Sequence, residues 1–210
     1  MEKLIKKGAE AEIWLKEWMG RQAVFKVRKP RGYMIAELDE ELRRQRTIKE
    51  ARTLVEAKKV NVLTPTVYFV DMANSTIIMQ YIRGDSLRLL LKDGGNVTKA
   101  CRQLGEALAS LHSAGIIHGD PTTSNFILSD GRLYALDFGL SIHSTDIEDK
   151  AVDIHLLKEI LSADIPDRFK EVYSEVLESY VSRLGDAGKE VVERSKAIEL
   201  RGRYARGQWG

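Results

Sequence analysis

The chain has 210 residues, of which 43% are hydrophobic and 30% charged, so it is long enough to form one or two domains around a buried core. Its formal net charge of +2 is too small to indicate a nucleic-acid partner by itself, and its single cysteine, Cys101, excludes a disulfide framework or a multi-cysteine zinc site. No apolar run is long enough to cross a membrane and the first ten residues do not resemble a signal peptide, which predicts a cytoplasmic protein with no membrane partner.

The first thirty positions predict three antiparallel strands joined by two turns, centred on residues 4–5, 13–15 and 23–27. The loop between the first two strands contains a single glycine. Such a loop can lie over phosphates and donate backbone N–H groups to them, although a plain hairpin gives the same pattern. The candidate phosphate-contacting residues of this loop are Gly8, Ala9, Glu10 and Ala11.

Lys26 lies among the alternating apolar residues of the third strand, where a lysine usually belongs to a solvated face. The next element is predicted to be a helix over residues 35–57, most of whose charges are expected to be solvated. Glu50 shares a stripe of this helix with Thr47, Leu54 and Ala57 that can face the sheet. Glu50 is therefore the acid of the helix best placed to face inward, and an ordinary surface charge is the alternative.

The middle of the chain predicts two further strands, residues 67–70 and 76–79, which complete a five-stranded sheet. A stretch with no clear period follows, and then a short helix over residues 86–91. Residues 98–114 predict a strongly amphipathic helix that ends at Gly115. Within it, Cys101 is expected to be an inert core thiol and His112 a helix-terminus cation or an exposed residue.

The stretch from 116 to 140 carries the strongest chemical signal in the sequence. It contains His-Gly-Asp at 118–120, Asn125, and Asp-Phe-Gly at 137–139. Two short apolar runs around the turn 129–131 predict a hairpin that brings Asp120, Asn125 and Asp137 to one point. Asp-Phe-Gly or the Asp–Asn spacing alone would mean little, because Asp and Asn favour turns. Together they indicate a site for a magnesium-bound nucleotide and an acceptor that loses a proton.

The last third predicts three helices, at about 151–161, 166–184 and 187–200, and a closing tail over 201–210. Asp153 is expected either to brace the catalytic loop or to be a solvated acid near the start of its helix. Ser141, Ser144 and Thr145 are possible phosphate acceptors. The tail mixes arginines with aromatic residues and has no acids, which favours contact with RNA or with a partner. Its candidate contact residues are Arg201, Arg203, Tyr204, Arg206 and Trp209.

The motif at 116–140 is similar to the protein-kinase catalytic loop, with Gly119 in place of the usual arginine. With VFKVRKPRGY, LDEELRRQRTIKEARTL, LDFGLS and LRGRYARGQW, the chain closely resembles the kinase/ATPase subunit of the KEOPS complex, the Bud-thirty-two family. That resemblance implies ATP and Mg²⁺ as cofactors, with Asp120 as the catalytic carboxylate and Asn125 and Asp137 as magnesium ligands. It further implies that Lys26 neutralises phosphates, that Glu50 partners Lys26, and that the adenine lies against the hinge. The implied hinge residues are Met79, Gln80, Tyr81 and Ile82.

The fold implied is α+β, a minimal bilobal protein-kinase-like fold. It has an N-terminal nucleotide-binding lobe over 1–80, a reduced helical lobe over 81–200 and a basic tail over 201–210. The activity implied is that of an atypical serine/threonine protein kinase or ATPase that supports threonylcarbamoyladenosine formation at position 37 of certain tRNAs. The implied partners are an ASKHA-fold threonylcarbamoyl transferase subunit, a small adaptor subunit, and tRNA through the tail. The alternatives are an aminoglycoside- or choline-type phosphotransferase, a Rio-type kinase, and a non-catalytic RNA-binding scaffold.

Overall fold

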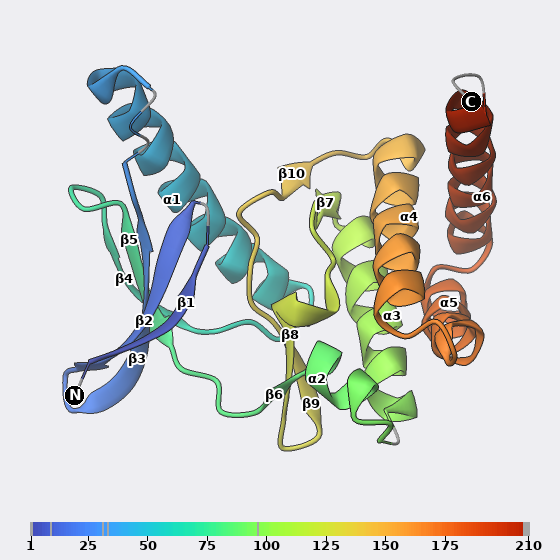
Figure 1. The fold of residues 1–210 in the computed structure, drawn as a ribbon, viewed down its shortest axis with the longest axis horizontal. Coiled ribbons are helices and arrows are strands. Elements are labelled where there is room, and N and C mark those ends of the chain that lie inside the picture. Colours follow the sequence, from blue (N-terminus) through green and yellow to red (C-terminus); the bar gives the residue numbers. More distant parts are fainter. Residues whose placement is uncertain (1, 9, 31, 33, 96, 208–210) are drawn as a thin grey trace.

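The molecule, described here from a computed structural model, consists of an antiparallel sheet with one long helix and a helical half joined to it by a short segment (Figure 1). The structure describes residues 2–207 except 9, 31, 33 and 96, and for 202–207 only the backbone. Within this part of the chain, no helix combines the length and apolarity that a bilayer crossing requires. The expected α+β architecture, with a five-stranded antiparallel sheet and a helical half, is confirmed.

The sheet has five strands, as the sequence predicts, and their order is β1-β2-β3-β5-β4. All neighbours are antiparallel, and Lys26 lies between Ile13 of β2 and Ile77 of β5. On β3, Lys26 and Arg28 are both buried, because residues two apart on a strand point to the same face. The strands are β1 (Lys3–Lys7), β2 (Ala11–Trp18), β3 (Arg21–Arg28), β4 (Val67–Asp71) and β5 (Thr76–Gln80).

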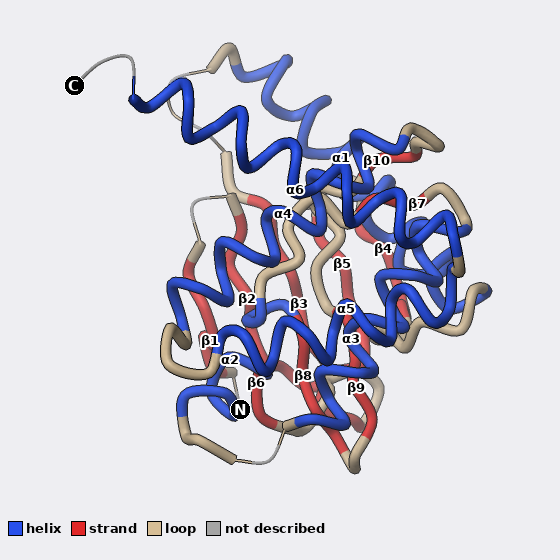
Figure 2. The backbone as a smooth tube through the Cα atoms, turned by 90° about the vertical axis from the view of Figure 1, so that its right-hand side faces the viewer, coloured by secondary structure: helices blue, strands red, loops and turns tan. Residues whose placement is uncertain are grey.

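Helix α1 (Ala36–Lys59) lies beside the sheet (Figures 1 and 2). Its buried residues include a stripe along one face. Thr47, Glu50, Leu54 and Ala57 are all buried, at the spacing of three or four residues that one helix face requires. The predicted stripe is therefore confirmed, and Glu50 faces inward although it carries a charge. Exposed charges cover most of the remaining surface of the helix.

The helical half is built around α3 (Thr98–Ser113), which packs closely against α5. Leu104, Leu108 and Leu111 are fully buried on one face of α3, as its amphipathic pattern predicts. Gly105 allows the close approach, because a Cβ there would lie 2.2 Å from the carbonyl oxygen of Val176. The other helices of this half are α2 (Leu87–Lys92), α4 (Ile147–Asp164), α5 (Phe169–Leu184) and α6 (Asp186–Gly207).

Several helix boundaries differ from the predicted ones, most of all those of the last three helices. Helix α4 begins at Ile147 rather than 151, because Asp146 caps it by accepting a hydrogen bond from the backbone N–H of Glu148 (2.9 Å). Helix α5 begins at Phe169, after a turn over 166–168. Helix α6 continues to Gly207, so that the residues predicted to begin the tail after position 200 are the last turns of a helix.

The predicted hairpin is present and positions the central motif. It joins β8 (Phe126–Ser129) to β9 (Arg132–Ala135) through Asp130 and Gly131, whose φ angles of 49° and 73° fit a two-residue turn. The short helix η1 (Thr123–Asn125) precedes β8. Three two-residue strands complete the connections: β6 (Asp85–Ser86) pairs with β8, and β7 (Ile116–Ile117) with β10 (Ile142–His143).

Candidate active site

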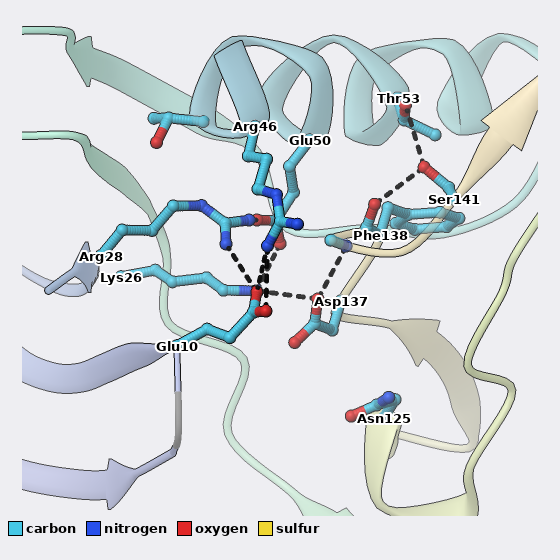
Figure 3. A network of polar contacts seen from close by, with 12 residues as sticks. Glu10, Lys26, Arg28, Arg46, Glu50, Thr53, Asn125, Asp137, Phe138 and Ser141 are labelled. Atoms are coloured by element: carbon cyan, nitrogen blue, oxygen red, sulfur yellow. Dashed lines mark hydrogen bonds and ion pairs between the residues drawn. The ribbon is translucent and has the colours of Figure 1, made fainter. Parts of the chain in front are cut away.

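Three charged side chains from distant parts of the chain meet between the sheet and the hairpin (Figure 3). Lys26 of β3 lies 2.5 Å from Glu50 of α1 and 2.8 Å from Asp137, which follows β9. Lys26 and Glu50 are 6% and 1% exposed, so their ion pair is shielded from water. A buried lysine on a strand is therefore explained by its partners, and it is not a solvated surface charge.

The electrostatics favour the ionised forms of Lys26 and Asp137, whereas burial raises the pKa of Glu50. Burial alone would lower the pKa of Lys26, but the carboxylates of Glu50 and Asp137 outweigh it and raise that pKa above its ordinary value. Burial would raise the pKa of Asp137, but the ammonium group of Lys26 holds it well below its usual range. Asp137 also accepts a hydrogen bond from the backbone N–H of Gly139 (2.9 Å). Asp137 is thus an anion at neutral pH, which is the form in which a carboxyl group binds Mg²⁺.

The hairpin brings Asp120 and Asn125 together in the second part of the site. The side-chain amide of Asn125 donates to the carboxylate of Asp120 (2.9 Å) and to its backbone carbonyl (3.0 Å). With the amide nitrogen engaged there, the amide oxygen of Asn125 is the atom suited to a cation. A carboxylate and an amide oxygen fit Mg²⁺, which takes few protein ligands when phosphates and water supply the rest.

Asp153 of α4 braces the backbone of the loop that carries Asp120, which is the first of its two predicted roles. It is fully buried and accepts hydrogen bonds from the backbone N–H groups of His118 (2.7 Å) and Gly119 (2.8 Å). Its carboxylate also lies 3.1 Å from His112 Nε2, and His112 Nδ1 lies 2.7 Å from the hydroxyl of Tyr180. The expectation that His112 could be an exposed residue is therefore wrong, because its ring is buried and both ring nitrogens have partners.

The sequence carried a signal for this buried chain of contacts. His112 follows Leu108 by four residues, which places it on the buried face of α3. His118 is also buried, between the rings of Phe126 and Phe138, and burial lowers its pKa. It therefore acts as a structural histidine, as the sequence suggested.

The Asp-Phe-Gly segment is fixed by tight packing. A Cβ at Gly139 would lie 3.1 Å from Asp137 and 3.3 Å from Arg28, so that the backbone can pass here only as glycine without displacing these groups. Ser141 is buried and its hydroxyl donates to the carbonyl of Phe138 (2.7 Å). The expectation that Ser141 is a candidate phosphate acceptor does not hold, because its hydroxyl is enclosed and already engaged.

Arg28 was not predicted as part of the site. It is 4% exposed and lies 2.6 Å from the second carboxylate oxygen of Glu50 and 3.5 Å from Glu10 (Figure 3). Glu10, in the loop between β1 and β2, also pairs with Arg46 of α1 at 2.9 and 3.0 Å. The spacing of two residues from Lys26 on one strand was the signal that could have found Arg28.

Two cavities meet at Lys26 and Asp137. One, of about 230 Å³, has mostly apolar walls that include Val24, Met79 and Leu136. All four predicted hinge residues, 79–82, line it, together with Asn125. The other, of about 340 Å³, is lined by the loop residues Gly8, Glu10 and Ala11 and by Asp120. An apolar pocket that opens into a charged one suits a flat base joined to phosphates.

Some predicted residues lie away from this site or outside the described part. Ala9 and Trp209 are outside the described residues, and Arg203, Tyr204 and Arg206 belong to α6 but have no described side chains. Arg201 is exposed, and its guanidinium lies 2.8 Å from Glu148 of α4. Four of the five predicted contact residues at the end of the chain, Arg201, Arg203, Tyr204 and Arg206, thus belong to α6 and are distant in the sequence from the Lys26 cluster.

Comparison with known proteins supports a kinase architecture. The model of the protein kinase domain family matches residues 22–163. Among solved structures, the chain is similar to the Rio2 kinase–ADP/Mg²⁺–phosphoaspartate complex from Chaetomium thermophilum, with a TM-score of 0.64 and 15% sequence identity. That match covers 91% of this chain and 70% of the other, and at this identity it shows the fold alone.

Sequence relatives are much closer. The chain is 43% identical to the KEOPS complex subunit Bud32 of Pyrococcus abyssi, over 99% of this chain and 98% of that protein. It is also 42% identical to a probable bifunctional tRNA threonylcarbamoyladenosine biosynthesis protein of Methanobrevibacter smithii, over 96% of this chain. The chain spans only 36% of the length of that bifunctional protein, so the activity of the whole relative is not carried over by this match.

Proposed function

This chain belongs to the Bud32 family within the protein kinases, and on that premise we propose that it transfers the γ-phosphoryl group of ATP with the help of Mg²⁺. The observation that carries the proposal is the convergence of Lys26, Asp137, Asn125 and Asp120 on two adjoining cavities, one of them apolar. Phosphoryl transfer needs positioning and positive charge more than covalent chemistry, and this cluster provides both.

Each residue has a distinct part in the proposed reaction. Residues 79–82 and the apolar cavity walls hold the adenine, and the loop over 8–11 covers the phosphates. Lys26, kept protonated and aimed by Glu50, neutralises phosphate charge. Asp137 and the amide oxygen of Asn125 hold Mg²⁺, which when bound supplies further positive charge to the phosphates. Asp120 orients the attacking hydroxyl or water and accepts its proton.

We further propose that the acceptor is a serine or threonine hydroxyl, in autophosphorylation, or water, in ATP hydrolysis. The P. abyssi relative is named as a KEOPS subunit, and the bifunctional relatives are named for threonylcarbamoyladenosine biosynthesis in tRNA. By that relationship this chain works with an ASKHA-fold threonylcarbamoyl transferase subunit and a small adaptor subunit to modify tRNA. Its ATP turnover regulates the transferase.

Measuring ATP turnover with purified protein tests the enzymatic part of this proposal. Asp137→Ala removes the anionic magnesium ligand and should abolish turnover, with or without the partner subunits and tRNA. Asp186→Ala is the matched control, because Asp186 is an exposed acid at the start of α6 and should leave turnover unchanged. Equal turnover in the wild type and Asp137→Ala would favour the non-catalytic scaffold instead.

The end of α6 is the proposed contact with tRNA. Replacing Arg201, Arg203 and Arg206 together by alanine keeps good helix formers in α6 while removing three cations. Affinity for tRNA should fall, and its dependence on salt should become weaker, because fewer phosphates are neutralised. ATP binding should not change. An unaltered tRNA affinity in a filter-binding assay would rule out this contact.

A further inference from the structure

Arg28 holds the same buried carboxylate that Lys26 holds. Lys26 takes one oxygen of Glu50 (2.5 Å) and Arg28 takes the other (2.6 Å), and all three side chains are almost fully buried. Without Arg28, the second oxygen of Glu50 would be a buried acceptor that lacks this charged donor, which is a costly arrangement. Lys26 and Arg28 together constrain both oxygens of Glu50, and Arg28 thereby helps to fix the rotation of α1 relative to β3.

The same guanidinium also reaches toward the loop over the phosphates. Arg28 lies 3.5 Å from Glu10, whose carboxylate is paired with Arg46 at 2.9 and 3.0 Å. Arg46 precedes Glu50 by four residues on α1. The Arg28–Glu50 pair and the Glu10–Arg46 pair therefore both involve this helix. The loop has Gly8 but lacks a glycine-rich sequence, and these ion pairs fix its position relative to the helix (Figure 3).

Many protein kinases instead position the lysine–glutamate pair by phosphorylation of the activation segment. Here the place of the arginine that would read such a phosphate is taken by Gly119. Its φ is +79°, and a Cβ there would lie 2.3 Å from the carbonyl oxygen of Leu140, so no larger side chain fits. The following segment is held to α1 by contacts from Ser141 to Thr53 (3.4 Å) and from His143 to Glu56 (2.9 Å).

We propose that Arg28 is a positioning residue that keeps the Lys26–Glu50 pair and the phosphate loop assembled for nucleotide binding without any phosphorylation of the chain. This inference rests on the proposed function, because it assigns Arg28 a task in that same ATP site. Arg28 also lines the cavity of about 340 Å³, but the role proposed here is exerted through its ion pairs with Glu50 and Glu10.

Affinity for a non-hydrolysable ATP analogue with Mg²⁺ tests this role, because the analogue cannot phosphorylate the protein. Arg28→Lys keeps the charge but cannot hold Glu50 and reach Glu10 together, and should weaken binding about tenfold, the effect of one lost charge-assisted hydrogen bond. Arg43→Lys is the matched control. Arg43 pairs with Asp39 on the same helix at 2.6 Å, lines neither cavity of the site, and should bind the analogue as the wild type does.

Binding is measured well below the thermal transition of each variant, so that a purely structural role of Arg28 would lower the transition temperature without changing the affinity of the folded protein. Wild-type protein treated with phosphatase should bind the analogue unchanged. Wild-type affinity in Arg28→Lys, or a phosphatase effect as large as that of Arg28→Lys, would overturn the inference. Failure of the proposed function is separate, since it would appear as undiminished ATP turnover in Asp137→Ala.

Discussion

At the scale of single residues, the chemistry of the site depends on the two carboxylate partners of Lys26. Its ammonium group contacts Glu50 on one side and Asp137 on the other. Glu50 is the more enclosed partner and is shared with Arg28, whereas the side chain of Asp137 is 41% exposed and reaches the cavities. The contact between Lys26 and Asp137 can therefore be replaced when a nucleotide and its metal bind, while the ion pair with Glu50 keeps Lys26 in position.

The depressed pKa of Asp137 predicts an acid-dependent part of the stability. A group whose pKa is lower in the folded state stabilises the protein above its ordinary pKa near 4, and this contribution is lost as the pH falls through the folded value. Between pH 5 and 2, the wild type should lose stability more steeply than Asp137→Asn, by at most about one proton per molecule. Urea titrations at a series of pH values measure this difference, and parallel curves for the two proteins would contradict it.

The site residues that could be predicted are those whose spacing in the sequence places them on one face of a helix or at one end of a hairpin. Glu50 could be predicted because it shares the helical spacing of the apolar residues on the buried face of α1. Asp120, Asn125 and Asp137 could be predicted because a hairpin brings the segments at its two ends close together. Arg28 and His112 were missed because charged side chains on a strand or at a helix end are usually solvated. Only their partners, Glu50 and Asp153, make their burial favourable, and those contacts are distant in the sequence.

At the scale of elements, the contact between α3 and α5 depends on Gly105. Alanine usually stabilises a helix relative to glycine by about 1 kcal/mol. Here a Cβ would lie 2.2 Å from Val176 O and 2.3 Å from Ser179 Oγ, so Gly105→Ala should instead destabilise the protein by about 1–3 kcal/mol, as overpacking does. Urea denaturation measures the change. Ser182→Ala on the exposed face of α5 is the control, with an expected change within about 0.5 kcal/mol.

Asp153 connects α4 to the catalytic loop, and its neutralisation should affect rate more than nucleotide affinity. Asp153→Asn keeps one acceptor oxygen for the N–H groups of His118 and Gly119 and places an amide where the other oxygen lies. We expect a loss of about 1–3 kcal/mol in stability and a lower kcat, because Asp120 follows those N–H groups directly. The affinity for ATP should stay near that of the wild type.

Kinetics and binding separate these effects for Asp153. Asp149→Asn is the control, since Asp149 lies one turn earlier on α4. If Asp153→Asn bound ATP more weakly with an unchanged kcat, Asp153 would support nucleotide binding and not the position of Asp120.

Element boundaries were harder to predict than element positions. The hairpin β8–β9 and the five strands could be predicted because turn residues and alternation are local signals. The start of α4 depended on the cap at Asp146, and the length of α6 depended on its packing along α4, which is a contact between distant segments. For that reason residues 201–207 read as a tail in the sequence although they are helical.

At the scale of the whole molecule, the pair Lys26–Asp137 connects the sheet to the segment that follows the hairpin of the helical half (Figure 3), at the place where the two cavities adjoin. In the proposed function, binding of ATP with Mg²⁺ exchanges this pair for contacts of Lys26 with phosphate and of Asp137 with the metal. The cross-link between the two halves is thereby replaced and not lost. Bound nucleotide should therefore stabilise both halves of the protein against unfolding, and this stabilisation should depend on the metal.

Thermal unfolding with and without ligand measures this stabilisation. At about one hundred times the dissociation constant of ATP–Mg²⁺, the free energy of unfolding should rise by about 2.7 kcal/mol, which is about 5–10 °C in the transition temperature for a chain of this size. Chelating Mg²⁺ with EDTA, or replacing Asp137 by asparagine, should remove most of the shift, and Asp186→Asn should not. An equal shift in Asp137→Asn would mean that nucleotide binding does not pass through the exchange of the Lys26–Asp137 pair, since a neutral asparagine side chain cannot supply an anionic ligand for the metal.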